Sequence, residues 1–307
     1  MASAAEIKAR INGVRDTKKI TDAMYMISSS KMRRSLADLE RTTPYFTALE
    51  KKIGELFHYI PETKNRYFRV PHPDRVSHMN HGVLLITSDK GLAGAYNAEA
   101  IKLCEEYMRR HPRTVIFIIG EYGRQYFLSK KLPFVESFAY SADRPSITVA
   151  RRICADILEY YDDERLDEIS IIYTDYMGAR TGECKKVTLL PLEKTGFSKS
   201  KSEKVYEKEF LPSPDQVLDG VVPGYIMGFI YGCLTESYCS EQQARMNAMK
   251  SASDNAEEII SSLRLQYNKM RQAAITGEMI EITAGVKALK KKRTGQTKER
   301  HGHTYDT

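Results

Sequence analysis

Residues Tyr267 to Leu289 read YNKMRQAAITGEMIEITAGVKAL and close a helical pattern that begins near Pro214. At ~1.5 Å per residue, a helix from Pro214 to Leu289 would be roughly 110 Å long. A compact domain is only about 30 Å across, so the helix is predicted to extend beyond its domain. Its last turns carry an apolar stripe, and a bare amphipathic end of this kind needs a partner surface. The stripe consists of Ile275, Met279, Ile282, Val286 and Leu289.

Composition is that of an ordinary soluble protein, with 307 residues and a net charge of +7. Most of that charge lies in the last residues, because residues 287–307 hold seven Lys or Arg against two acids. The rest of the chain is nearly balanced, which argues against nucleic acid as a partner. The five cysteines are scattered without metal-ligand spacing, so neither a zinc site nor a cofactor is expected. The amino terminus has no apolar signal-peptide segment.

Residues 4–57 are predicted to form one long helix with a kink at Pro44. Apolar or small residues recur in two columns seven residues apart, the pattern of a coiled coil. The first column is Ala4, Ile11, Lys18, Tyr25, Met32, Leu39, Phe46 and Ile53, and the second is Ile7, Val14, Thr21, Ser28, Ser35, Thr42, Leu49 and Leu56. The middle lacks large aliphatic residues. This lack favours either a solvated stretch of coil or a surface that contacts another protein only weakly.

Residues 83–193 change to alternating strands and helices. Apolar runs predict strands at 83–87, 114–119, 168–174 and 186–190, with a further short strand at 134–140. Amphipathic segments predict helices at 95–110, 122–131 and 147–161. Continuous apolar strands separated by helices indicate a parallel sheet covered on both faces, as in a small Rossmann-like domain.

The first strand is followed by a glycine-containing loop from Ser88 to Gly94 that opens a helix. A loop of this form can hold a phosphate group. It matches neither of the common nucleotide-binding glycine patterns, however, and no catalytic set of Ser, His, Cys and Asp stands near it. The competing interpretation is a tight turn that uses glycine for its backbone angles.

The last helix opens with four glycines spaced four apart, so they line one side. The apolar run at 221–234 is too short for the ~20 residues of a membrane span. We therefore expect close packing in water against Phe46 and Ile53 of an antiparallel first helix, at the foot of the coil. The glycines are Gly220, Gly224, Gly228 and Gly232.

The expected fold is α/β: a long antiparallel coiled coil of N- and C-terminal helices with an inserted Rossmann-like α/β domain. Six segments are predicted. They are a first coil helix (1–60), a linker (61–82), the α/β domain (83–193), a second linker (194–213), a second coil helix (214–290) and a basic disordered tail (291–307).

Three stretches resemble the gamma subunit of rotary, F-type ATP synthases. The first is KITDAMYM at 19–26, running on to SKMR at 30–33, and the second is ITSDKGLAGAYN at 86–97. The third extends from ARM at 244–246 through SDNA at 253–256 and YNK at 267–269 to RQAAITGE at 271–278. With the order of long helix, α/β domain and long helix, the resemblance covers essentially residues 4–290.

The resemblance implies a central rotor shaft that couples ion flow through the membrane to ATP synthesis or hydrolysis and does no chemistry itself. Its partners would be a hexamer of alpha and beta subunits, an epsilon subunit and the ring of c subunits. It would be peripheral to the membrane, on the cytoplasmic side or the equivalent face of an organelle. Met24, Arg245, Gln272 and Thr276 match family positions near contacts with beta subunits.

Two other function classes remain open from the residues alone. A nucleotide-binding α/β enzyme would use the loop from Ser88 to Gly94, and the isolated chain would then bind or hydrolyse ATP. A static coiled-coil scaffold would bind the hexamer without coupling anything to it.

Overall fold

The computed structural model describes residues 3–59, 65–68, 79–178, 182–193, 197, 211 and 213–300. They fall into two compact units. One lies within residues 24–249, and the other combines the residues up to Ala23 with those from Lys250 onward. The linkers predicted at 61–82 and 194–213 lie mostly outside the described residues, so the boundaries of these two segments stay predictions.

The unit of residues 24–249 is built on a four-stranded sheet with the order β2-β1-β3-β4. Its strands are β1 (His81–Ile86), β2 (Thr114–Ile119), β3 (Glu168–Thr174) and β4 (Cys184–Leu190). β1 pairs in parallel with both β2 and β3, but β4 is antiparallel to β3. The prediction of a wholly parallel sheet is therefore wrong at β4. A parallel partner needs a crossover of about a dozen residues or more, and the segment between β3 and β4 is too short for one.

The strand predicted at 134–140 is also wrong. Within this described segment only Tyr140 forms a bridge, an isolated one with Ile119 at the edge of β2. The backbone N–H of Val135 donates to Ile116 O, and that of Gly120 donates to Tyr140 O. The segment therefore touches the edge strand at separate points and does not continue the ladder.

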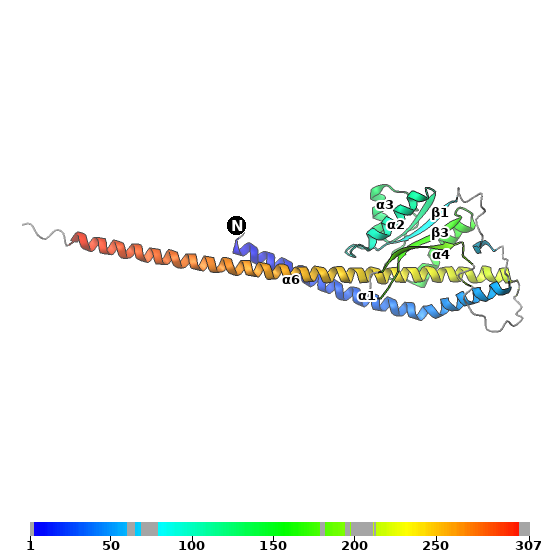
Figure 1. The fold of residues 1–307 in the computed structure, drawn as a ribbon, viewed down its shortest axis with the longest axis horizontal. Coiled ribbons are helices and arrows are strands. Elements are labelled where there is room, and N and C mark those ends of the chain that lie inside the picture. The colour runs from blue at the N-terminus through cyan, green and yellow to red at the C-terminus, as the bar shows by residue number, and fades with distance from the viewer. Residues whose placement is uncertain are drawn as a thin grey trace, which may run out of the picture. The chain divides into compact units, whose positions relative to one another are not determined.

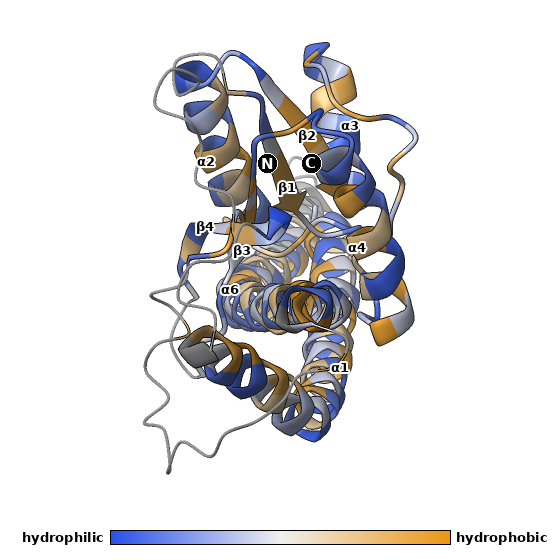
Figure 2. Ribbon diagram, turned by 90° about the vertical axis from the view of Figure 1, so that its right-hand side faces the viewer, coloured by the Kyte–Doolittle hydropathy of each residue, from blue (hydrophilic) through white to orange (hydrophobic). Residues whose placement is uncertain are grey.

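Both faces of the sheet are covered by helices, as predicted. The helices are α2 (Tyr96–Arg110), α3 (Glu121–Lys130) and α4 (Ile147–Asp162). Because side chains alternate along a strand, Val83 and Leu85 of β1 pack in one cluster with α2 and α3. Leu84 and Ile86 pack in the other, with α4 and the long helices. Figure 2 shows apolar β1 between α2 and α4.

The two long helices are α1 (Ala4–Tyr59) and α6 (Pro214–Arg300). Residues 214–249 of α6 lie beside the sheet (Figure 1). α6 passes a length and hydropathy test for a membrane span. Its apolar stripe is nevertheless buried in the same core as β1 and β3, as expected for the core helix of a domain in water. That stripe consists of Leu218, Val222, Ile226 and Ile230.

Only part of the glycine row makes a close approach between α1 and α6. A Cβ added at Gly228 would overlap the ring of Phe46, and one at Gly224 would lie 3.5 Å from Leu49 Cδ1. A Cβ at Gly220 or Gly232 would meet no described atom within 4 Å. These contacts make the two helices antiparallel here, and Ile53 is fully buried in the core beside them. α1 continues through Pro44, and its ribbon bends in the second half of the helix (Figure 1).

Three small polar residues in the middle of the α1 heptad columns are buried inside the chain. In the unit of residues 24–249, Ser28 is 2% exposed and Ser35 is 9% exposed. In the other unit, Thr21 is 8% exposed. Both interpretations of these positions, solvent or another protein, are therefore wrong for the three residues. Small side chains let two helices approach closely, and the hydroxyl of Thr21 is satisfied by the carbonyl of Lys18.

The second unit is a short antiparallel coil of the first turns of α1 and the later turns of α6. Ile7 and Ile11 pack against Ile260 and Leu263. Farther along α1, Lys18 lies 3.2 Å from the Glu257 carboxylate. These pairings put higher numbers on α1 opposite lower numbers on α6, which defines the antiparallel direction.

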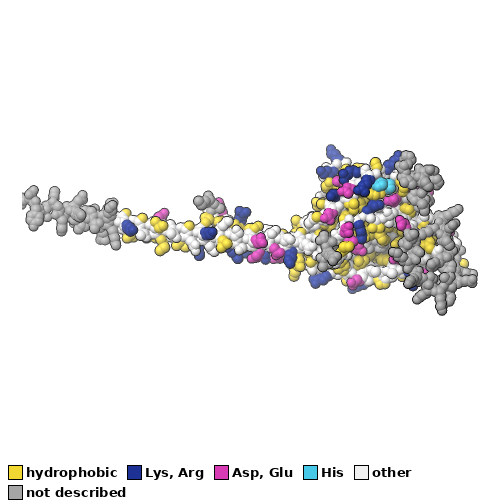
Figure 3. Space-filling model, in the orientation of Figure 1, with side chains coloured by type: hydrophobic (Ala, Val, Ile, Leu, Met, Phe, Trp, Pro, Cys, Tyr) yellow, Lys and Arg dark blue, Asp and Glu magenta, His cyan; other side chains and the backbone are white. Residues whose placement is uncertain are grey.

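Beyond Met270, the described side chains of α6 are predominantly exposed. Ile275, Met279, Ile282, Val286 and Leu289 are each at least half exposed. Figure 3 shows apolar side chains at the surface along this part of the helix. α6 continues to Arg300, so disorder was wrongly predicted for 291–300. Lys and Arg are good helix formers, and propagating an existing helix is easy. Residues 301–307 lie outside the described residues.

The glycine contacts give a matched pair of substitutions. We expect Gly228→Ala to lower the free energy of unfolding by ~1–3 kcal/mol, because the added methyl group overlaps Phe46. Gly232→Ala meets no described atom, so it should raise stability by ~0.5–1 kcal/mol through helix propensity. Urea denaturation followed by circular dichroism measures both. Equal effects at the two positions would contradict the packing described.

Candidate functional site

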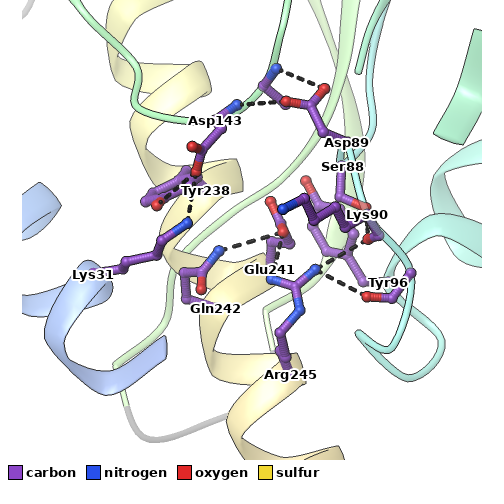
Figure 4. Close-up of polar contacts among 12 residues, drawn as sticks. Lys31, Ser88, Asp89, Lys90, Tyr96, Asp143, Tyr238, Glu241, Gln242 and Arg245 are labelled. Atoms are coloured by element: carbon purple, nitrogen blue, oxygen red, sulfur yellow. Dashed lines mark hydrogen bonds and ion pairs between the residues drawn. The ribbon is translucent and has the colours of Figure 1, made fainter. Parts of the chain in front are cut away.

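The loop that follows β1 is organised by the carboxylate of Asp89 (Figure 4). One carboxylate oxygen accepts from the backbone N–H groups of Glu121 and Ala142, each at 3.1 Å. The other accepts from the backbone N–H of Asp143 at 3.0 Å and from the hydroxyl of Ser141. Glu121 is the first residue of α3. An anionic side chain of the chain itself therefore occupies this helix N-terminus, where an external anion could otherwise bind.

Arg245 of α6 holds the same loop from the opposite side. Its Nη2 donates to the carbonyl oxygens of Lys90 and Gly91 at 3.0 and 3.1 Å, and its Nη1 donates to Glu241 Oε1 at 2.6 Å. The side chains of Arg245 and Glu241 are 8% and 7% exposed. Burial raises the pKa of Glu241, and the charge and hydrogen bond of Arg245 oppose that rise.

Ser237, two turns before Arg245, connects the end of β3 to the start of α2. Its Oγ accepts from the hydroxyl of Tyr96 at 3.0 Å and from the backbone N–H of Thr174 at 3.2 Å. Tyr96 is the first residue of α2 and Thr174 the last of β3. Burial raises the pKa of Tyr96 well above its ordinary value, so the phenol remains a hydrogen-bond donor.

A third set of contacts connects α1, the segment between α3 and α4, and α6. Lys31 Nζ lies 2.9 Å from Asp143 Oδ1, and the hydroxyl of Tyr238 donates to the same oxygen at 3.2 Å. Burial alone would raise the pKa of Asp143. The hydrogen bond and charge of Lys31, together with Tyr238, lower it below its ordinary value. Figure 4 shows Lys31 and Tyr238 converging on Asp143 from different helices.

Asp89, Asp143 and Arg245 line a cavity of about 450 Å³. Met24 and Ile27 of α1 line one side and Leu92 of the loop another. Leu92 has a left-handed backbone angle, φ 64°, and is 63% exposed. Among the described residues, no group of His, Cys, Asp and Glu side chains is placed to hold a metal ion.

The loop from Ser88 to Gly94 has the wrong polarity for a phosphate site. A phosphate-binding loop presents backbone N–H groups to the ligand, but here the carbonyls of Lys90 and Gly91 face Arg245. The backbone N–H of Ser88 already donates to Asn97 Oδ1 at 2.9 Å. The geometry therefore does not favour the nucleotide-enzyme alternative.

The predicted beta-contact positions are divided between the two units. In the unit of residues 24–249, Met24 lines the cavity, whereas Arg245 is buried in contacts within the chain. In the other unit, Gln272 and Thr276 are exposed, and the Thr276 hydroxyl donates to Gln272 O at 2.8 Å. Their contact with beta subunits stays a prediction, and Arg245 has an additional role that the sequence did not indicate.

Most residues that build this site were not found from the sequence. Asp89 lies in the loop that the sequence singled out, but its contacts were not predicted. Asp143, Ser237, Tyr238 and Glu241 were not identified. The four-residue spacing of Glu241 and Arg245 is the one available signal, because such pairs meet on a helix. The other contacts join residues that are distant in the chain, which no local pattern reveals.

Comparisons with known proteins agree along the whole described architecture. Residues 3–289 match the family model described as ATP synthase. The ATP synthase gamma chain of Alkaliphilus metalliredigens is 37% identical over 288 residues, which is 93% of this chain and 98% of that one. The chain belongs to the ATP synthase gamma family.

A second member of the gamma family, the ATP synthase gamma chain of Acetivibrio thermocellus, is 36% identical over 298 residues. The match covers 94% of this chain and all of the relative. A rotor chain of the mitochondrial ATP synthase of Euglena gracilis has a TM-score of 0.59 at 15% identity. It covers 89% of this chain and 98% of its own length, so the fold is shared as well.

The buried pair on α6 predicts a pH-dependent defect. We expect Arg245→Gln to cost ~3–5 kcal/mol at pH 8, because it leaves the Glu241 carboxylate buried without its partner. The loss of Arg245 raises the folded-state pKa of Glu241 further above 4.5. The folded variant then binds a proton more readily than the unfolded chain, so the penalty shrinks as pH falls towards 4.5.

Urea denaturation between pH 8 and pH 5 measures this penalty. The double variant Glu241→Gln with Arg245→Gln carries no charge at either position, so its difference from the native chain should show much less dependence on pH. A single-variant penalty that does not change with pH would contradict the assignment.

Proposed function

We propose that this chain is the central rotor shaft of an ATP synthase. Its coil turns inside a hexamer of alternating alpha and beta subunits, and its foot and α/β domain lie on the ring of c subunits beside an epsilon subunit. The observation that carries the proposal is membership of the gamma family along nearly the full length, at 36–37% identity to gamma chains. Ion flow turns ring and shaft together, while nucleotide chemistry takes place on beta.

The α/β domain is a mechanical part and not a catalytic one. In sheets of this kind, ligands bind at the carboxyl ends of the strands, where successive connections leave in opposite directions. Here that point lies between β1 and β3. It is filled by Ser237 and Arg245 of α6. The chain changes the nucleotide sites of beta only through differential contact with their conformations.

The exposed end of α6 supports this role. Met279, Ile282 and Leu289 are each more than 60% exposed, although they are apolar. Exposed apolar stripes mark partner surfaces. An apolar sleeve formed by the upper part of the hexamer would cover the stripe without polar contacts that hold one angle, so the shaft could rotate.

Contact with beta loops is proposed at two places. In the unit of residues 24–249, Ile27 and Leu92 expose apolar surface on two sides of the cavity, next to Met24. In the other unit, Gln272 and Thr276 present polar groups on exposed turns of α6. An off-centre shaft offers such groups to one beta subunit at a time, so the three beta subunits are biased differently.

The chain acts as a peripheral subunit of the membrane-bound complex. The apolar stripe at the start of α6 lies in the α/β core, which leaves it unsuited to lipid. We place the chain on the cytoplasmic face of the plasma membrane or the equivalent face of an organelle, where the hexamer has access to ATP and ADP.

Rotation separates a shaft from a static scaffold. The chain is assembled with alpha and beta subunits, the hexamer is fixed to a surface, and a bead is attached through Ser129→Cys on the exposed end of α3. With ATP, we expect continuous rotation in one direction. A bead that stays still while ATP is hydrolysed would identify a scaffold and overturn the proposal.

A further inference from the structure

Three side chains of α6 enter the crevice at the carboxyl ends of β1 and β3. Ser237, Glu241 and Arg245 are spaced four residues apart, so they project from one face of the helix. Ser237 binds the end of β3 and the start of α2, while Arg245 binds two carbonyls of the loop after β1. Figure 4 shows Arg245 and Glu241 below that loop, with Tyr96 beside them.

We propose that Arg245 is a positioning residue for coupling, because its guanidinium locks the angle at which the α/β domain sits on the coil. In this role α6 takes the place of the ligand that a sheet of this topology usually binds at its switch point. The inference rests on the proposed function, and it concerns contacts inside the chain and not a contact with beta.

Apolar burial and directional hydrogen bonds contribute differently to the attachment of α6 to the α/β domain. The foot of α6 is attached to the sheet by Val222, Ile226 and Ile230. Hydrophobic contact is strong but non-directional, so it does not by itself fix an angle. Charge-assisted hydrogen bonds to two backbone carbonyls are directional. The α/β domain is the part proposed to lie on the c ring, so its torque reaches the coil through this joint.

The tie between Lys31, Asp143 and Tyr238 acts in the same joint from another direction. Its ion pair is more than one-third exposed on both sides, so it is weak by itself. Arg245 is the buried member with several partners, which is why the test is placed there.

The test variant is Arg245→Lys. Lysine keeps a positive charge opposite Glu241, so the buried carboxylate is not left alone. A single ammonium group cannot reproduce the planar fork that spans Glu241 and two carbonyls. The matched control is Arg151→Lys, the same change at an exposed position of α4 that makes no hydrogen bond or ion pair with the described residues. Tyr96→Phe is a second variant, which removes only the hydroxyl bond to Ser237.

The first measurement is amide hydrogen exchange in the assembled complex of this chain with alpha and beta. In Arg245→Lys we expect exchange at residues 88–95 to rise roughly tenfold, the effect of losing a hydrogen bond from a charged donor. Tyr96→Phe should produce a smaller rise around the start of α2, and Arg151→Lys none.

The second measurement is the angular spread of a bead on the α/β domain during rotational pauses. The spread should widen in Arg245→Lys and less in Tyr96→Phe, and it should stay at the native value in Arg151→Lys. In membranes, ion pumping per ATP hydrolysed should fall in the same order. A role in folding alone would reduce assembly without widening the spread.

Unchanged exchange and an unchanged angular spread in Arg245→Lys would overturn the inference. If that variant does not assemble, a native spread in Tyr96→Phe would overturn it and a widened one would support it. Failure of the native complex to rotate would instead overturn the proposed function, so the two failures are distinguishable.

Discussion

The structure depends on the occupation of one crevice by the chain's own helix. The ends of β1 and β3 leave a space that other sheets of this topology use for ligands. Here Arg245 and Ser237 fill it with polar groups that are bonded to the backbone around them, and Glu241 pairs with Arg245. A buried ion pair is seldom the most stabilising choice, because removing both charges from water is costly. Compared with apolar side chains in the same crevice, the buried ion pair adds hydrogen bonds of defined direction.

The same helix meets different demands along its length. Between Pro214 and Leu234 it is a core helix, with an apolar face under the sheet and close approaches at Gly224 and Gly228. From Ser237 to Arg245 it fills the crevice. In the other unit it pairs with the first turns of α1 and then exposes apolar side chains alone. Each change in packing is matched by a change in composition, so one continuous helix can serve as core, joint and shaft.

The sequence predicted most of the architecture because the signals are local. Uninterrupted apolar runs gave β2 and β3 their correct bounds, and heptad spacing gave the coil. Predictions failed where the outcome depends on distant residues. Ser28 and Ser35 resembled surface residues, yet they are buried because small side chains suit a close helix contact. Asp89 lies in a loop that the sequence singled out and Asp143 in none, but the contacts of both went unpredicted, because their partners lie far away in the chain. Arg245 was singled out only through the family resemblance, and its buried role was missed.

The loop after β1 joins the inner crevice to the outer surface. Arg245 binds the carbonyls of Lys90 and Gly91 on the inside, and Asp89 fixes the start of the loop through α3. Leu92 follows at once with a left-handed backbone, which costs a residue of this type ~1–3 kcal/mol and persists only where its surroundings enforce it. The consequence is an apolar side chain that stands out beside the cavity. A displacement of Arg245 would therefore move the surface that is proposed to meet beta, so the joint and the contact surface act as one mechanical element.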